Sequence, residues 1–202
     1  PSWTEGATIF VNGKKVAANP EAGQYACINR EWKDNDQVEI QLPMQLSMRT
    51  WQVNKNSVSV DYGPLTMSLK IDEDYVKKDS RATAIGDSKW QEGADASQWP
   101  TYEIYAKTPW NYALVLGKNE PLKDFKVVHK EWPADNFPFT VASTPIEVKA
   151  IGCKVPSWVI DQYDLCSELP EMDAPKGEKE EITLIPMGAA RLRVSAFPNT
   201  RE

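Results

Sequence analysis

The sequence contains very little histidine and cysteine. His129 is its one histidine, and Cys27, Cys153 and Cys166 are its three cysteines among 202 residues. A Ser-His-Asp triad or a multi-histidine metal site would have to be built around His129 alone, and no nucleophile motif accompanies it. Three cysteines at unrelated spacings fit neither a disulfide framework nor a paired zinc cluster. We therefore expect no metal and no cofactor. The thiols should be buried, with a Cys153–Cys166 disulfide as the alternative.

An excess of basic residues and long apolar runs are also lacking. Lys and Arg total 23 against 29 Asp and Glu, which gives a formal net charge of −6. Nucleic acids and anionic lipid surfaces are bound through clustered basic side chains. The longest apolar runs, such as residues 112–116, are much shorter than the ~20 residues that span a bilayer. We therefore expect neither a nucleic-acid partner nor a membrane partner.

Recognisable catalytic motifs are absent. The sequence contains no phosphate-binding loop, no dinucleotide-binding glycine motif and no HExxH zinc motif. Glycosidases use two carboxylates at a set separation, but the abundance of Asp and Glu selects no pair. Candidates such as Glu103 and Asp124 cannot be told apart from ordinary surface acids. We assign no catalytic residue.

What the sequence does contain is a long series of short strand patterns separated by Gly, Pro, Asn and Asp. Strands are predicted at residues 7–11, 14–16, 25–29, 37–42, 57–60, 65–71, 102–106, 111–116, 125–129, 139–142, 146–151, 182–185 and 191–197. No segment of helix length carries an apolar stripe with a 3.6-residue period. These patterns predict an all-β fold, an antiparallel β-sandwich that is jelly-roll-like.

Two turns are specified by their residues. Asn12-Gly13 suits a two-residue type I′ turn, because both residues tolerate a positive φ. Gly63-Pro64 predicts a bend or bulge between two strands. The two acids of Asp34-Asn35-Asp36 could suggest calcium, but a polar hairpin turn is the simpler interpretation.

The strand series is interrupted once. Residues 73–100 are rich in Asp, Lys, Ser and Gln, and we interpret them as a linker or an insertion packed on the surface, with a short helical turn near residues 94–98. Two packed sandwich units are predicted on either side, at residues 1–72 and 101–202. The acidic, Pro-rich stretch 166–181 is expected to be a solvated loop.

Short motifs near the two ends of the chain follow a recognisable order. They are Pro1-Ser2-Trp3, Val11-Asn12-Gly13, Gly23-Gln24-Tyr25, Arg30-Glu31-Trp32-Lys33-Asp34, Leu42-Pro43-Met44, Tyr62-Gly63-Pro64-Leu65 and the closing Pro186-Met187-Gly188-Ala189-Ala190-Arg191-Leu192-Arg193-Val194-Ser195. In this order and spacing they resemble the C-terminal β-sandwich region of glycoside hydrolase family 127 (GH127), the β-L-arabinofuranosidase-like proteins. Residues 73–180 match only diffusely.

The resemblance implies an (α/α) barrel upstream in the parent polypeptide, with catalytic Glu residues and a zinc-bound Cys nucleophile. None of those barrel motifs occurs here, and the three cysteines lack the family's paired-Cys context. We therefore expect a non-catalytic segment that braces the barrel and is no enzyme by itself. The family resemblance suggests a periplasmic or secreted setting. An Arg and an apolar residue that the family pattern places before Pro1 are missing, which predicts an exposed sheet edge and self-association.

Aromatic residues provide a second functional hypothesis. Trp3, Tyr25 and Trp32 are expected to be core anchors. Trp90, Trp99 and Trp110 lie in or beside predicted loops, where exposed rings could stack on sugars. The alternative function is therefore a stand-alone carbohydrate-binding module for plant-type glycans. The competing interpretation is that these rings cover a sandwich end or an interface with the barrel.

Overall fold

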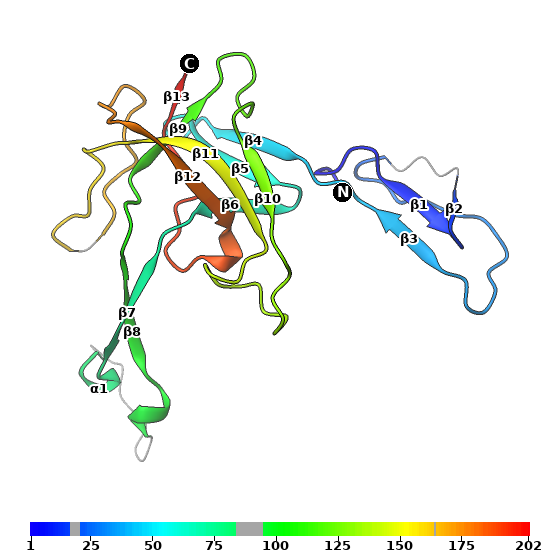
Figure 1. Cartoon of the computed structure of the whole chain (residues 1–202), viewed down its shortest axis with the longest axis horizontal. Helices are drawn as coiled ribbons and strands as arrows, with labels where there is room; N and C mark the ends of the chain where they lie inside the picture. Colours follow the sequence, from blue (N-terminus) through cyan, green and yellow to red (C-terminus); the bar gives the residue numbers. More distant parts are fainter. Residues whose placement is uncertain (17–20, 84–94, 164) are drawn as a thin grey trace.

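The computed structural model spans residues 1–202 and describes all of them except 17–20, 84–94 and 164 (Figure 1). The elements, in chain order, are β1 (Thr8–Val11), β2 (Lys14–Lys15), β3 (Val38–Gln41), β4 (Leu46–Trp51), β5 (Ser57–Tyr62), β6 (Leu65–Leu69), β7 (Glu73–Lys78), α1 (Ser80–Thr83), η1 (Ala96–Gln98), β8 (Thr101–Ala106), β9 (Tyr112–Leu116), β10 (Lys126–His129), β11 (Ile146–Lys154), β12 (Lys179–Pro186), η2 (Met187–Ala189) and β13 (Asn199–Arg201). The predicted all-β class is confirmed. In the described part of the chain, no helix has the length and apolar character needed to cross a membrane.

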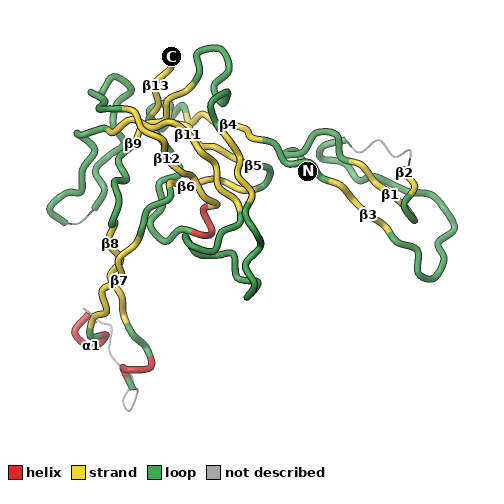
Figure 2. Tube along the Cα trace, viewed as in Figure 1, coloured by secondary structure: helices red, strands yellow, loops and turns green. Residues whose placement is uncertain are grey.

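Eight strands form one curled sheet. The strand order is β13-β9-β11-β12-β6-β5-β4, with β10 paired to β11. The pairs are antiparallel, as predicted, except for the parallel pair β9–β13. Val58 in β5 and Phe197 just before β13 exchange backbone hydrogen bonds, each with an N···O distance of 2.9 Å. This bridge joins the β13 end of the sheet to β5, so the sheet closes around its interior (Figure 2). The jelly-roll order stays a prediction.

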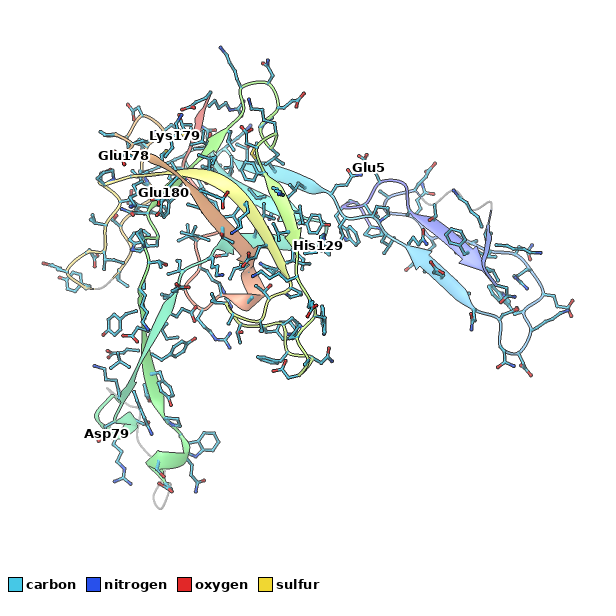
Figure 3. The ribbon with its side chains drawn as sticks, in the orientation of Figure 1. Glu5, Asp79, His129, Glu178, Lys179 and Glu180 are labelled. Atoms are coloured by element: carbon cyan, nitrogen blue, oxygen red, sulfur yellow. The ribbon has the colours of Figure 1, made fainter. Side chains whose placement is uncertain are left out.

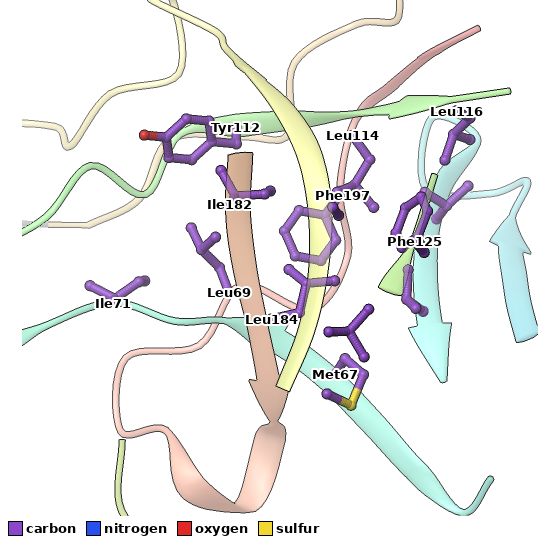
Figure 4. Close-up of a cluster of buried hydrophobic side chains, with 14 residues drawn as sticks. Met67, Leu69, Ile71, Tyr112, Leu114, Leu116, Phe125, Ile182, Leu184 and Phe197 are labelled. Atoms are coloured by element: carbon purple, nitrogen blue, oxygen red, sulfur yellow. The ribbon is translucent and has the colours of Figure 1, made fainter. Parts of the chain in front are cut away.

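Strand alternation produces the core inside this curled sheet. Inward side chains of β5, β6, β9, β11 and β12 meet there, and Phe197 lies among them without exposed surface (Figure 4). Met67, Leu114 and Leu184 are also fully buried. Because burying apolar surface contributes roughly 25 cal/mol per Å², this cluster is the principal source of stability in the curled sheet.

The first strands form a separate sheet, in the order β2-β1-β3. Asn12 and Gly13 both have positive φ, at 52° and 73°, and Val11 pairs with Lys14 across them, so the predicted two-residue turn is confirmed. The strand predicted at residues 25–29 is wrong, because this segment is irregular and β3 pairs with β1 instead. This three-stranded sheet projects away from the curled sheet (Figure 1).

The segment expected to be a linker or insertion contains a two-stranded ribbon. β7 and β8 pair antiparallel from Glu73 opposite Ala106 to Lys78 opposite Thr101. We call residues 72–83 and 95–107 the arm, which extends from the curled sheet instead of packing flat on its surface (Figure 1). The predicted helical turn corresponds to η1, whereas β7 was not predicted. The ribbon forms because Tyr75, Val76, Tyr102 and Tyr105 favour extended backbone.

Three further strand predictions need correction. β4 at one end of the sheet was not predicted, although Leu46 and Met48 alternate with Ser47 and Arg49 as in a half-buried strand. Residues 139–142 form a turn, and the closing strand begins at Asn199 and not at residue 191. Gly63-Pro64 forms a two-residue hairpin turn between β5 and β6. The division of the chain into two sandwich units on either side of residues 73–100 stays a prediction. In hydrogen bonding, β4, β5 and β6 join the same sheet as β9 to β13.

Several burial predictions are also wrong. Tyr25 is 99% exposed and Trp32 is 49% exposed, so neither is a core anchor, and Arg30 lies over the Trp32 ring at 5.0 Å. These aromatics lie in irregular segments that contribute no side chain to the buried core. Of the three cysteines, all of them free, Cys153 is buried, whereas Cys27 and Cys166 are exposed.

Candidate functional site

The three tryptophans expected to bind sugars do not form one platform. Trp90 lies outside the described residues. Trp99 lies between η1 and β8 and is 67% exposed. Trp110 lies beyond the other end of β8, and a six-residue strand is about 20 Å long. One sugar ring therefore cannot contact both.

Trp110 lines a cleft of about 740 Å³ at the base of the arm. Its ring packs edge-to-face on Trp158 with 5.1 Å between centroids, which fixes the ring but covers part of it. Ile104, Tyr105 and Arg193 line the same cleft. The Arg193 side chain is held by its Nε, which donates to the Ala190 carbonyl at 2.8 Å. The cleft thus combines an aromatic ring with a fixed cation, although most of its lining is apolar.

The arm carries exposed aromatic side chains on both faces. Tyr75 and Tyr102 are diagonal neighbours across the ribbon, with ring centroids 6.3 Å apart, and Tyr105 lies on the opposite face. Each of two tyrosines donates to a carboxylate two residues away, Tyr75 to Glu73 at 2.6 Å and Tyr105 to Glu103 at 2.5 Å. The hydrogen bond to Glu73 is the largest cause that raises the pKa of Tyr75, so this phenol stays protonated at neutral pH. The arm therefore offers neutral aromatic surface to a neighbour.

A second apolar surface was missed by the sequence interpretation. Residues 131–145 connect β10 to β11, and we call them the aromatic loop because Trp132, Phe137 and Phe139 are all exposed on it. Together with Leu65 and Met187, Trp132 and Phe139 line a groove of about 410 Å³. The sequence signal that could have identified this surface was the high density of aromatic residues and prolines in Trp132-Pro133 and Phe137-Pro138-Phe139.

The acidic and histidine candidates have ordinary structural roles. Glu103 accepts hydrogen bonds from Tyr105 and from Lys78, which lower the pKa of its carboxyl. Asp124 is exposed, with Lys123 at 4.0 Å. His129 Nε2 lies 3.3 Å from Tyr62 Oη at the exposed end of β10, far from Glu178 and Glu180 (Figure 3). These groups do not converge on one point.

The zinc chemistry of the resembled family does not fit the residues of this chain. The Cys153 thiol is buried beside the Ala113 carbonyl, and burial is the main cause that raises its pKa, which disfavours the thiolate that zinc requires. Among the described residues, no three His, Cys, Asp or Glu side chains are placed to hold a metal ion. Asp36 instead accepts hydrogen bonds from the Asn12 side chain and the Lys33 backbone, as a turn residue.

Comparison with known proteins identifies relatives for part and for all of the chain. Residues 1–44 match the family model of the GH127 middle domain of β-L-arabinofuranosidases. No curated protein sequence matches significantly. A solved structure described as a glycoside hydrolase matches all of this chain at 20% identity with a TM-score of 0.53. A GH127 β-L-arabinofuranosidase from Geobacillus stearothermophilus T6 matches 99% of it at 19% identity with a TM-score of 0.52.

These structural matches concern the fold, because both identities are low. This chain covers 27% of the first structure and 25% of the second, so it corresponds to about a quarter of each. The family model adds a sequence match at the Asn12-Gly13 hairpin and the motifs around it. The resemblance to the β region of GH127 glycoside hydrolases that the sequence indicates is therefore confirmed.

Proposed function

We propose that this chain is a non-catalytic β-sandwich segment of a larger glycoside hydrolase related to GH127, and that it braces the (α/α) barrel of the parent polypeptide. The observation that carries the proposal is the location of its exposed large apolar side chains. Most of them lie on three parts of the molecule, which are the three-stranded sheet with its loops, the arm and the aromatic loop. A further exposed group, Val159, Ile160, Tyr163 and Leu165, lies between β11 and β12. Exposed apolar surface of this extent is typical of a surface that another domain covers.

The three-stranded sheet supports this role most directly. Val38 and Ile40 on β3 lie opposite Val11 and Ile9 on β1, so all four share one face. Ile9 and Val11 are buried, whereas Val38 and Ile40 are about half exposed. A sheet that covers only half of its apolar face within its own chain gains stability when a neighbouring domain covers the other half.

The test of the proposal begins with activity. We expect the isolated 202-residue chain to leave β-L-arabinofuranosides unhydrolysed, as measured by release of free arabinose. In the parent polypeptide, Trp132→Ala combined with Phe139→Ala should lower the thermal midpoint of the barrel. Tyr163→Ala, which removes another exposed aromatic outside these three parts, should leave it unchanged. Robust hydrolysis by the isolated chain would refute the non-catalytic assignment.

A stand-alone carbohydrate-binding module is the alternative, and the exposure of Trp99 favours it. Calorimetric titration of plant-type oligosaccharides into the isolated chain separates the two functions. Saturable binding that Trp99→Ala or Trp110→Ala abolishes would support the module. Unchanged binding in both variants, or no binding, would exclude these two rings as its platform.

A further inference from the structure

A row of three lysines and one threonine, which we call the lysine row, crosses four neighbouring strands on the outside of the curled sheet. Lys126 in β10 lies directly opposite Lys149 in β11, and Lys149 lies opposite Thr183 in β12. The Lys70 backbone N–H donates to the Thr183 carbonyl, which extends the row to the end of β6. Neighbouring strands are about 4.8 Å apart, so the row is roughly 15 Å long.

A buried carboxylate holds three lysines at this row. Glu147 lies two residues before Lys149 on β11, and its side chain is only 5% exposed. Its Oε1 is 2.5 Å from Lys130 Nζ and 3.1 Å from Lys70 Nζ, and its Oε2 is 3.8 Å from Lys149 Nζ. Burial raises the pKa of this carboxyl, but the hydrogen bonds from Lys130 and Lys70 outweigh burial and lower it. Glu147 is therefore ionised, fixes the ammonium groups of Lys130 and Lys70 through hydrogen bonds, and attracts that of Lys149.

The row carries more positive charge than its acids neutralise. Three acids, Glu147, Glu181 and the Asp72 of the adjoining hollow, face four lysines, which are Lys70, Lys126, Lys130 and Lys149. Glu181 is 4.0 Å from Lys149 and two-thirds exposed. Lys126 is exposed and has no ion-pair partner in the described part of the chain. Like charges directly opposite each other on a sheet face are destabilising. In a protein of net charge −6, this local excess is a specific feature that a bound anion would stabilise.

A polar hollow of about 230 Å³ adjoins the lysine row where the arm leaves the sheet. Lys70 and Thr183 belong to both the row and the hollow, and Asp72, Thr108 and Glu181 supply further polar groups around it. Carboxylates and hydroxyls paired at close range are the groups that hydrogen-bond to a sugar's hydroxyls. A ligand that filled the hollow would place its neighbouring substituent at the lysine row.

We propose that the lysine row and the hollow together bind an acidic saccharide, with sugar hydroxyls in the hollow and a uronate carboxylate on Lys149 and Lys126. The lysines select the negative charge and the hollow selects the hydroxyl-bearing ring. Lys149 is held by Thr183 Oγ1 at 2.7 Å, so it is already positioned for the carboxylate. The site adjoins the arm at Asp72, and Thr108 also lines the neighbouring Trp110 cleft. The proposal does not depend on the proposed function.

The experiment is a calorimetric titration of the chain with trigalacturonate, with a neutral galactose trisaccharide and inorganic phosphate as comparison ligands. We expect trigalacturonate to bind at least tenfold more tightly than either. Raising the salt concentration to 1 M, where the Debye length is about 3 Å, should weaken it severalfold more than it weakens any neutral ligand. Equal affinity for phosphate would overturn the saccharide assignment, and equal affinity for the neutral trisaccharide would overturn the role of the lysines.

Variants then locate the site. Lys149→Met should weaken trigalacturonate about tenfold, and Lys126→Gln about threefold, because Lys126 contributes charge without a fixed contact. Lys14→Gln is the matched control, since Lys14 is also an exposed strand lysine but lies in the three-stranded sheet. Lys126 supports no ion pair of the described residues, so its variant reports on binding even if Lys149→Met impairs folding. Equal weakening by Lys126→Gln and Lys14→Gln would overturn the proposed location.

Discussion

The curled sheet and the three-stranded sheet use similar strands with opposite results. In the curled sheet, alternation directs side chains into a closed interior, and Phe197, Leu114 and Leu184 lose all contact with solvent. In the three-stranded sheet, alternation is equally regular, yet Val38 and Ile40 stay about half exposed. The difference is that the curled sheet closes on itself through the Val58–Phe197 bridge, whereas the described residues form no second layer of comparable size on the smaller sheet.

A regular strand pattern therefore does not ensure that the apolar face of a sheet is covered by another layer. A β-sheet needs another layer on its apolar face, and within the described part of the chain the curled sheet has such a layer whereas the three-stranded sheet does not. The curled sheet should therefore keep its stability in isolation. The three-stranded sheet should depend on a neighbour, and four predictions test this contrast.

The largest effect is expected from Phe197→Ala. Truncating a fully buried Phe typically costs about 3–5 kcal/mol, because it removes apolar burial and leaves a cavity. The free energy of unfolding, measured by urea denaturation, should fall by that amount. Tyr25→Ala removes an aromatic of similar size from the N-terminal region and should change stability by less than about 0.5 kcal/mol, because Tyr25 is almost fully exposed. Similar losses in both variants would contradict the contrast.

The second effect concerns the charged network on the outside of the curled sheet. Glu147→Gln removes the carboxylate that accepts hydrogen bonds from Lys70 and Lys130. Hydrogen bonds to charged groups contribute about 1.5–3 kcal/mol, so the free energy of unfolding should fall by an amount in that range. Glu181→Gln is the control, because Glu181 is mostly exposed and its one lysine is 4.0 Å away. An unchanged free energy of unfolding in Glu147→Gln would show that the lysines find other partners.

The pH dependence should follow from the same carboxylate. Hydrogen bonds from Lys130 and Lys70 lower the pKa of Glu147 in the folded state despite its burial. Its stabilising contribution is therefore complete above the unfolded pKa of about 4.3, and it is lost as the pH falls through the lower folded value. Urea denaturation at pH 7 and at pH 3 should show a smaller loss of stability in Glu147→Gln than in the wild type. The pKa of Asp61 is also lowered, and the pH-dependent stability that Asp61 contributes should remain in the variant.

The smallest effect on stability is expected on the exposed face of β3. Val38→Ser combined with Ile40→Ser should change the free energy of unfolding of the curled sheet by less than about 0.5 kcal/mol, because both side chains lie outside its core. The same variant should reduce self-association of the isolated chain in sedimentation velocity, since less apolar surface is exposed. Thr50→Ser on β4 provides an exposed strand control. Unchanged association in the β3 variant would show that this face is not the contact.

Local features were predictable where a few neighbouring residues decide the structure. Asn12-Gly13 specified its turn because both residues accept positive φ, and the strands around it followed from their alternation. The strand β4 was missed even though Leu46-Ser47-Met48-Arg49 carries the alternation of a half-buried strand. Tyr25 and Trp32 were wrongly predicted to be buried in the core. Large aromatic side chains occur both in cores and on exposed surfaces, and the sequence alone does not distinguish the two.

The candidate sites were less predictable, since they depend on contacts between distant segments. The sequence could not reveal that Trp99 and Trp110 lie at opposite ends of β8. It also could not place Lys70, Lys126 and Lys149 in one row, because strand register decides which residues are neighbours.

By itself, the sequence determined the all-β class, the first hairpin turn and the resemblance to GH127 glycoside hydrolases. These features depend on residue type, period and order, which act over a few positions. The tertiary structure alone decided that the sheet closes through Val58 and Phe197, that Val38 and Ile40 stay exposed, and that Glu147 gathers three lysines. These features depend on pairings between residues that are up to 139 positions apart in the chain (197 − 58), and no local pattern encodes them.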